Sequence, residues 1–268
     1  MNYRHSYHAG NFADVVKHLA EVAILAHLAQ KETPFAVIDS HAGRGSYDLA
    51  SEEALKTGEA ASGILALQDV SGPPLLERYL ALVAESGARA YPGSPLIAAK
   101  MLRPQDRLVA IEKHPEEAQT LKTVLSPWRK ARVEEADGYA RLVALLPPPE
   151  RRGLVLIDPP FEASDEFESL GRAVRDALRR FATGVYLIWY PIKSDSAARA
   201  LEGEVLMDAR KALKIEAAID APDGKLARAA TLVLNPPFGC AAEMEKTLAI
   251  VAPKLKARTR LVWLAGEE

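Results

Sequence analysis

Residues Leu154–Ser164 read LVLIDPPFEAS, and this stretch decides how the rest of the chain is interpreted. Its apolar run predicts a buried strand, which stops at Asp158-Pro159-Pro160-Phe161. The two prolines fix the backbone and remove two amide donors. The strand is therefore expected to end in a rigid turn that is rich in hydrogen-bond acceptors.

Three other apolar runs also end on polar residues, at Asp39, at Glu112 and at Asp137-Gly138. Helical patterns such as Ala13–Gln30 separate these runs. Strands that alternate with helices predict an α/β fold, with a doubly wound and mostly parallel sheet covered on both faces. Ligands of such sheets bind beyond the carboxyl ends of the strands, and all four polar motifs fall there.

The interval between Asp39 and Glu112 is more than twice the roughly 30 residues that a βαβ step needs. We therefore predict that residues 50–104 form a small helical insert subdomain. Residues 1–49 and 105–268 are predicted to form the sheet domain. The insert would lie beside the ligand edge, either as a cover for a substrate or as a structural addition.

Composition limits the possible classes of protein. The chain has 268 residues, of which 49% are hydrophobic, enough for one large core. The single cysteine, Cys240, excludes a disulfide framework and a cysteine-rich zinc site. The polar N-terminus and short apolar runs predict a cytoplasmic protein without membrane segments.

The formal net charge of −2 gives no overall attraction to nucleic acid. Local basic clusters exist, and we interpret them as solvated surface rather than as a binding site. The first consists of Arg172, Arg175, Arg179 and Arg180, and the second of Arg129, Lys130 and Arg132.

The strand ends together describe a pocket for an adenosine-bearing cofactor. Gly43 lies in the loop HAGRG, which suits close approach of a ligand but is not the dinucleotide G-x-G-x-x-G motif. Glu112 is placed to accept hydrogen bonds from two ribose hydroxyls. Asp137-Gly138 could hold an adenine amine or cap a helix.

The turn Asp158-Pro159-Pro160-Phe161 indicates the chemistry. An exocyclic amine on a planar base can donate its two N–H groups to the carboxylate of Asp158 and the carbonyl of Pro159. The ring of Phe161 is expected to stack on the base, a contact worth about 1–3 kcal/mol in single-strand binding sites. The motif predicts methylation of an amine by a sulfonium donor, without a metal or a covalent nucleophile.

A second copy of the motif, Asn235-Pro236-Pro237-Phe238, follows a later apolar run. An Asn side chain can also accept from an amine, so this copy is chemically competent. We assign the chemistry to Asp158 and interpret Asn235 as a structural turn, because it comes after the expected switch point of the sheet.

Eight motifs of the chain, taken in order, resemble a known family. They are YRHSYHAGNFADVVKH, HAGRGSY, TGEA, YPGSPLIA, IEKHP, ADGY, RRGLVLIDPPFE and TGVYLIWYP. The resemblance is to the bacterial 23S ribosomal RNA adenine-N6 methyltransferases, and it extends over essentially the whole chain. It implies a Rossmann-like class I methyltransferase fold.

The resemblance also implies ligands and roles. S-adenosylmethionine is the expected cofactor, S-adenosylhomocysteine the product, and 23S rRNA the partner, protein-free or early in assembly, of a monomeric enzyme. Asp158 would be catalytic, and Tyr3 would reach the substrate adenine or the cofactor edge. The cofactor-contacting positions that the family pattern implies are Lys17, His18, His41, Ser94, Glu112, Asp137, Gly138 and Asp158.

The residues alone do not give all of these roles. Without the resemblance, Ser94-Pro95 reads as a helix start and His18 as a histidine on a helix face. The chain also departs from the family twice. Phe161 replaces the usual Tyr and loses a phenolic hydroxyl, and Arg44 replaces a small residue of the glycine loop, where it could contact a phosphate or carboxylate.

Three other functions are compatible with parts of this pattern. A DNA adenine-N6 methyltransferase shares the acceptor turn, but it must flip its base from a duplex and usually carries a basic recognition domain. A non-catalytic binding protein would not need the acceptors of Asp158 and Pro159. An NAD-dependent oxidoreductase would be expected to carry the G-x-G-x-x-G motif.

Overall fold

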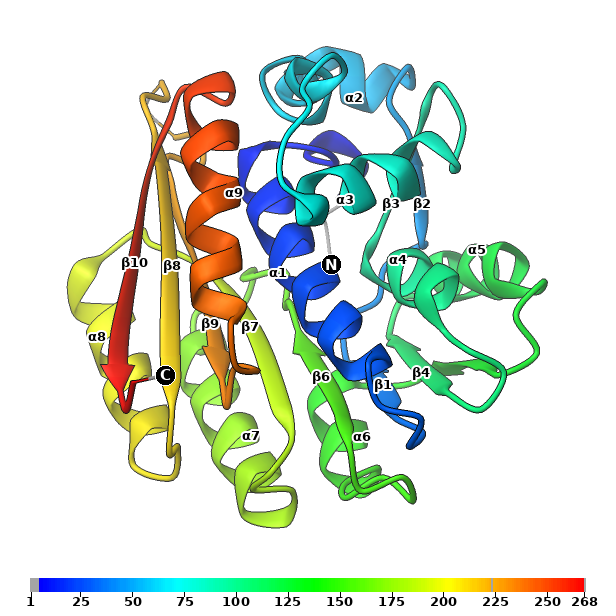
Figure 1. The fold of residues 1–268 in the computed structure, drawn as a ribbon, viewed down its shortest axis with the longest axis vertical. Helices are drawn as coiled ribbons and strands as arrows, with labels where there is room; N and C mark the ends of the chain where they lie inside the picture. The colour runs from blue at the N-terminus through cyan, green and yellow to red at the C-terminus, as the bar shows by residue number, and fades with distance from the viewer. Residues whose placement is uncertain (1–4, 223, 268) are drawn as a thin grey trace.

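The protein is built around one eight-stranded sheet, shown by a computed structural model that describes residues 5–222 and 224–267 (Figure 1). The strands of this sheet are β1 (Ala36–Asp39), β4 (Arg107–Glu112), β5 (Ala131–Glu135), β6 (Gly153–Ile157), β7 (Val185–Pro191), β8 (Ala212–Ile219), β9 (Arg228–Leu234) and β10 (Ala257–Ala265). Their order across the sheet is β10-β8-β9-β7-β6-β1-β4-β5.

The sheet is mostly parallel, as predicted. β5, β4, β1, β6 and β7 are joined to one another, in this order, by parallel pairing. β9 pairs antiparallel with both β7 and β8, and β10 pairs antiparallel with β8, so only β9 and β10 run against the rest. The chain runs outward from β1 to β5 and then returns to β6, which places the topological switch point between β1 and β6.

Helices cover both faces of the sheet. They are α1 (Phe12–Ala29), α2 (Glu52–Thr57), α3 (Pro74–Ala84), α4 (Ser94–Met101), α5 (Pro115–Leu125), α6 (Gly138–Ala144), α7 (Glu166–Arg180), α8 (Asp195–Leu206) and α9 (Cys240–Lys254). Figure 1 shows α9, α1 and α4 in front of the sheet and α6, α7 and α8 behind it. Two hydrophobic clusters fill these two layers.

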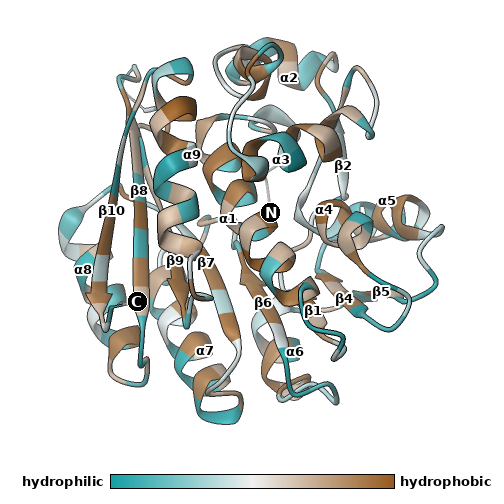
Figure 2. Ribbon diagram, viewed as in Figure 1, coloured by the Kyte–Doolittle hydropathy of each residue, from teal (hydrophilic) through white to brown (hydrophobic). Residues whose placement is uncertain are grey.

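β1 and β6 lie in the middle of the sheet and are buried at every position. Strands covered on both faces are expected to be apolar throughout rather than alternating, and β6 is indeed brown along its length in Figure 2. The switch point is therefore held in a rigid, fully packed part of the molecule.

Helix α1 precedes the first strand and lies across the sheet between α9 and α4. The amide side chain of Asn11 caps it by accepting hydrogen bonds from the backbone N–H groups of Ala13 and Asp14, each at 2.9 Å. Most of α1 is buried, yet four buried positions are polar: Asp14, Lys17, His18 and Glu21. Their spacing places them on one stripe of the helix.

Residues 50–104 contain α2, α3, α4 and the short 3-10 helices η2 (Glu59–Ser62) and η3 (Ile64–Leu67). β2 (Ser46–Asp48) and β3 (Ala90–Pro92) flank most of this segment as a separate antiparallel pair. Tyr79 of α3 and Ile97 of α4 belong to the same hydrophobic cluster as Leu19 of α1. The segment thus shares the core of the sheet, and its division as a subdomain stays a prediction.

No helix within the described part of the chain has the length and apolar character needed to cross a membrane.

Candidate functional site

A cavity of about 710 Å³ lies beyond the carboxyl ends of the parallel strands. It is lined by every residue that the sequence predicts to contact a cofactor, and by both prolines of the acceptor turn. These lining residues are Lys17, His18, His41, Gly43, Ser94, Glu112, Asp137, Gly138, Asp158, Pro159 and Pro160. Its volume is within the range of small-molecule sites, roughly 300–1,000 Å³.

The glycine loop and the end of β4 are joined by a hydrogen bond. Gly43 has a φ of +61°, and its N–H donates to Glu112 Oε2 at 2.8 Å. A Cβ at position 43 would collide with the hydroxyl of Tyr47. Glu112 Oε1 accepts from His114 N–H at 2.7 Å. Burial raises the pKa of Glu112, and its remaining lone pairs are available to hydroxyl donors in the cavity.

Asp137 caps helix α6 and lines the cavity. Its Oδ1 accepts from the N–H of Ala140 at 3.1 Å and its Oδ2 pairs with Lys113 at 3.0 Å, so the helix-cap interpretation is observed. Gly138 is the first residue of α6, and it packs against the loop that follows β1. A Cβ there would collide with the carbonyl oxygen of Ser40, so glycine permits this close approach.

His41 forms part of the same wall. Its Nδ1 lies 2.8 Å from Ser40 Oγ, and its ring meets the ring of Tyr139 edge-on at 4.8 Å. Burial lowers the pKa of His41 to about 4, so the imidazole is neutral near pH 7. Tyr139 in turn donates its hydroxyl to Glu166 Oε1 at 2.7 Å.

Asp39 ends β1 and supports the floor of the cavity. Ser94 donates its hydroxyl to Asp39 Oδ2 at 2.7 Å, and His41 N–H donates to Oδ1 at 3.3 Å. Burial raises the pKa of Asp39 to about 7. The position of Ser94 as the first residue of α4 is therefore both a helix start and a contact to the switch point.

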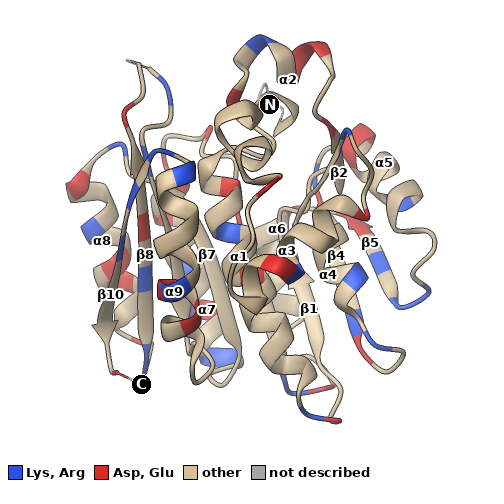
Figure 3. Ribbon diagram, turned by 45° about the horizontal axis from the view of Figure 1, so that its top comes forward, with Lys and Arg blue, Asp and Glu red and all other residues tan. Residues whose placement is uncertain are grey.

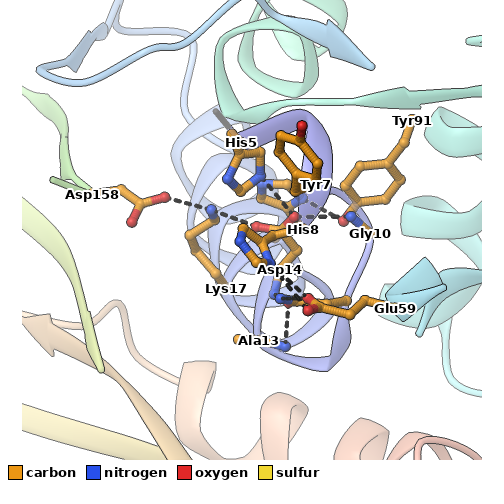
Figure 4. A network of polar contacts seen from close by, with 12 residues as sticks. His5, Tyr7, His8, Gly10, Ala13, Asp14, Lys17, Glu59, Tyr91 and Asp158 are labelled. Atoms are coloured by element: carbon orange, nitrogen blue, oxygen red, sulfur yellow. Dashed lines mark hydrogen bonds and ion pairs between the residues drawn. The ribbon is translucent and has the colours of Figure 1, made fainter. Parts of the chain in front are cut away.

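The carboxylate of Asp158 is held by a buried ammonium (Figure 4). Lys17 Nζ donates to Asp158 Oδ2 at 2.5 Å and to Asp14 Oδ1 at 2.8 Å. Burial opposes the charge, but the two carboxylates outweigh it and raise the pKa of Lys17 well above its usual value. The sequence predicts an acceptor turn with few competing donors. Instead, one Asp158 oxygen is already occupied, because α1 brings Lys17 to the end of β6.

His18 lines the same cavity through its imidazole ring. Its Nδ1 lies 2.7 Å from the hydroxyl of Tyr91, which lies 2.9 Å from that of Tyr79. Its Nε2 is buried and has no hydrogen-bond partner among the described residues. A buried polar atom without a partner is costly, so this nitrogen marks a place where a ligand can supply one.

Phe161 is not among the residues that line the cavity in this structure, and its stacking on a base stays a prediction. The residue has a φ of +51°, so its backbone is in the left-handed region that non-glycine residues rarely adopt. The ring packs against Phe167 at 4.9 Å and Trp189 at 5.9 Å between ring centroids. In this structure Phe161 therefore fixes the turn through packing. The other expected substrate residue, Tyr3, lies outside the described residues.

Arg44 contacts a carboxylate of the protein itself. Its guanidinium donates to both oxygens of Glu117 on α5, at 2.7 and 2.6 Å. The departure at this position thus ties the glycine loop to α5 rather than to a ligand.

The second copy of the motif lies at the opposite edge of the sheet. β9 runs antiparallel to β7, so Leu234 pairs with Tyr186 near the start of β7. The amide of Asn235 donates to the carbonyls of Ala182 and Gly184 at 3.0 and 2.8 Å. Asn235 therefore stabilises a turn far from the cavity.

The two basic clusters lie outside the cavity lining, and Figure 3 shows their charges interspersed with acids. Arg175 and Arg179 both pair with Asp208. Arg132 pairs with Glu134 at the outer strand of the sheet. These pairs fit a solvated surface. Within the part of the chain that is described, no group of three or more His, Cys, Asp or Glu is arranged to hold a metal ion.

Several residues of the site carry no separate signal in the sequence. Asp14 and Glu21 lie in a helix that reads as amphipathic, and Asp39 reads only as a strand end. The spacing of Asp14, Lys17, His18 and Glu21 could have shown them, because a polar stripe on an otherwise apolar helix indicates a buried polar network. Tyr139 and Glu166 come together only through the packing of α6 against α7.

Comparison with known proteins identifies the family. Residues 32–265 match the sequence model of the family described as "Ribosomal RNA large subunit methyltransferase D, RlmJ". The chain belongs to this family. It is thus a ribosomal RNA methyltransferase of EC class 2.1.1, and the family and enzyme class expected from the sequence are confirmed.

Individual relatives agree. Over 263 residues the chain is 40% identical to "Ribosomal RNA large subunit methyltransferase J" of Escherichia coli (strain K12), covering 95% of this chain and 94% of that protein. The protein of the same name from Haemophilus influenzae is 40% identical over 257 residues, 92% of each chain. A Legionella pneumophila protein of known crystal structure is 30% identical with a TM-score of 0.90, covering 97% of this chain and 99% of that one. This match confirms the expected fold.

Proposed function

We propose that the protein methylates the exocyclic N6 of a single adenine in 23S rRNA, with S-adenosylmethionine as donor and S-adenosylhomocysteine as product. N6 attacks the methyl carbon directly, and the Asp158-Pro159-Pro160-Phe161 turn orients the amine. The observation that carries this proposal is the position of Asp158. Its carboxylate follows the central strand β6 and lines the cavity that also contains Glu112 and the glycine loop.

The cavity suits the cofactor. Glu112 has acceptors available for the ribose hydroxyls, and the positive φ of Gly43 lets the backbone come close to a ligand. Asp137 and Gly138 would border the adenine, and Ser94, His41 and the unpaired Nε2 of His18 would border the amino-acid end. When bound, S-adenosylmethionine supplies an electrophilic methyl group on a sulfonium.

The acceptor turn supplies orientation rather than covalent chemistry. Lys17 occupies Asp158 Oδ2, and the described residues give Oδ1 no hydrogen-bond donor. We assign one N6–H to Oδ1 and the other to the carbonyl of Pro159, whose position is fixed by two consecutive proline rings. Such positioning keeps the nitrogen lone pair directed at the methyl carbon.

Methyl transfer must also release one proton. As the N–C bond forms, the C–S bond breaks, its electron pair stays on sulfur, and the nitrogen becomes acidic. Asp158 then accepts the N6 proton through Oδ1, which requires no base strong enough to deprotonate the neutral amine. Asp158 thus contributes the positioning of the amine and the acceptance of its proton once the N–C bond has formed.

An RNA substrate fits the family better than duplex DNA. The relatives from E. coli and H. influenzae are named as ribosomal RNA large subunit methyltransferases. RNA-modifying proteins commonly take unstacked bases from loops, which needs no separate duplex-opening domain. We therefore propose that the protein acts on protein-free or early-assembly 23S rRNA. We also propose that it is cytoplasmic and monomeric.

The acceptor preference tests the proposal. Purified protein is incubated with S-adenosylmethionine labelled in the methyl group and with unmodified protein-free 23S rRNA, assembled large subunits or adenine-containing duplex DNA. We expect label in protein-free 23S rRNA and far less in the other two. Labelling of duplex DNA alone would overturn the proposed substrate, and binding of the cofactor with no labelled acceptor would overturn the proposed activity.

A further inference from the structure

The carboxylate of Asp14 gathers three donors at the base of the catalytic turn (Figure 4). Its Oδ1 accepts from Lys17 Nζ at 2.8 Å. Its Oδ2 accepts from the backbone N–H of Gly10 at 2.9 Å and lies 2.9 Å from His5 Nε2. The side chain is 4% exposed. His5 and Lys17 outweigh the effect of burial and hold the pKa of Asp14 well below its usual range, so the group is a carboxylate.

Asp14 and Lys17 are one helical turn apart on α1, which points both side chains to the same side. The Lys17 ammonium therefore lies between two carboxylates, Asp14 on its own helix and Asp158 on the acceptor turn. A flexible lysine side chain has many rotamers, and a single ion pair fixes its ammonium poorly. Two charged partners on rigid elements fix its position.

We propose that Asp14 is a positioning residue of the methyl-transfer site that acts through Lys17. It holds the ammonium so that Lys17 engages only Oδ2 of Asp158 and leaves Oδ1 to the substrate amine. It also pairs with the Lys17 ammonium, so the positive charge is shared between two carboxylates and is not neutralised by Asp158 alone. This inference rests on the proposed function.

The same carboxylate connects the site to the N-terminal turn. The 3-10 helix η1 (His5–Tyr7) begins at His5, which lines the cavity, and Gly10 precedes the cap of α1. Asp14 Oδ2 binds both residues, and Asp14 Oδ1 binds the lysine that contacts Asp158, so the N-terminal turn and the acceptor turn share one anchor. A purely structural role would need this anchor for folding but not for the rate of chemistry.

The test compares single-turnover rates, cofactor affinity and melting temperature for wild type and Asp14→Asn, with unmodified 23S rRNA as acceptor. Asn keeps the shape but removes the charge, and one of its two terminal groups becomes a donor. We expect the rate at saturating S-adenosylmethionine and RNA to fall by up to about 100-fold, the effect of a small misplacement. The dissociation constant for S-adenosylmethionine, measured by calorimetry, should stay within about threefold, a change of less than 1 kcal/mol. Asp220→Asn, which alters an exposed ion pair with Arg258, is the matched control.

A double-mutant cycle with Lys17→Met decides whether Asp14 acts through Lys17. If it does, adding Asp14→Asn to Lys17→Met causes no further loss of rate. Equal losses in both backgrounds, or a wild-type rate in Asp14→Asn, would overturn the inference. If the Lys17→Met rate is below detection, the single variant decides: a lower rate with unchanged affinity supports the inference, whereas loss of affinity and melting temperature together overturns it. Failure of wild type to methylate would instead refute the proposed function.

Discussion

Lys17 and Asp158 are 141 positions apart in the chain, yet their charged atoms lie 2.5 Å apart in the wall of the cavity. The contact joins the helix that precedes the first strand to the turn after the central strand β6. One oxygen of the Asp158 carboxylate therefore already accepts a hydrogen bond before any substrate binds. This arrangement makes the two oxygens of Asp158 unequal, and the first prediction follows from that inequality.

Asp158→Asn should lose methyl transfer almost as fully as Asp158→Ala. An Asn side chain has one acceptor oxygen, which can accept a hydrogen bond from either Lys17 or the substrate amine. Its NH₂ group then faces the other of these two donors, so one hydrogen bond is lost. We expect a fall of about 100-fold or more in single-turnover rate, the scale of a lost acid–base group. Asp176→Asn on the exposed face of α7 is the control. A loss below tenfold would mean that the amide oxygen alone orients the amine.

Gly138→Ala should weaken both the fold and cofactor binding. The added Cβ would meet the carbonyl oxygen of Ser40, so α6 must move away from the loop after β1. Overpacking of this kind costs about 1–3 kcal/mol in free energy of unfolding. Gly203→Ala is the matched control, because position 203 lies in α8 with open space around it. There alanine should stabilise the helix by about 1 kcal/mol.

Denaturant unfolding and S-adenosylmethionine titration of both glycine variants check this prediction. A Gly138→Ala protein with wild-type stability and affinity would show that the contact between α6 and the β1 loop is loose.

Glu21→Gln should change how stability depends on pH. The Glu21 side chain is fully buried, and neither carboxylate oxygen has a hydrogen-bond partner among the described residues. Burial, with Asp39 and Asp158 nearby, raises its pKa well above the ordinary value of 4.5. Above about pH 4.5 the folded state keeps a proton that the unfolded state releases, so this group lowers stability as pH rises towards its folded pKa.

Glutamine at position 21 has no such proton. The free energy of unfolding of Glu21→Gln, relative to wild type, should therefore increase from pH 4.5 upwards, as measured by urea unfolding at several pH values. A constant difference across that range would show that Glu21 is ionised in the folded protein. Asp39, whose pKa is raised to about 7, contributes in the same direction in both proteins.

Asn235→Ala should destabilise the protein and leave its chemistry intact. The variant loses two hydrogen bonds to backbone carbonyls and places alanine at a φ of +52°. Together these effects cost about 2–4 kcal/mol in free energy of unfolding. Asn235→Gly, which tolerates positive φ, should recover part of that loss. Thermal melts and methyl-transfer rates test both, and a lost rate at full stability would contradict the assignment of chemistry to Asp158.

Most of the fold could be predicted because its elements carry local signals. β6 is apolar throughout and stops at two prolines, and α1 has a clear apolar periodicity. Periodicity does not give strand direction, however. That β9 runs antiparallel, and so carries Asn235 to the far edge, depends on how the last strands pair.

The site was predictable where it follows strand ends, at Glu112, Asp137 and Asp158. Contacts of the site between elements that are far apart in the sequence could not be predicted. The bond from Lys17 to Asp158, and the packing of Phe161 on Phe167 and Trp189, depend on tertiary contacts. The residue type could not indicate the positive φ of Phe161 either, because bulky residues rarely adopt it.

The central claim is that Asp158 orients adenine N6 for methyl transfer. The most direct measurement is nucleoside analysis of protein-free 23S rRNA after incubation with methyl-labelled S-adenosylmethionine and either wild type or Asp158→Ala. The account predicts label in N6-methyladenosine at one adenine with wild type, and none with Asp158→Ala despite retained cofactor binding. Label in another nucleoside, or unchanged N6-methyladenosine with Asp158→Ala, would contradict it.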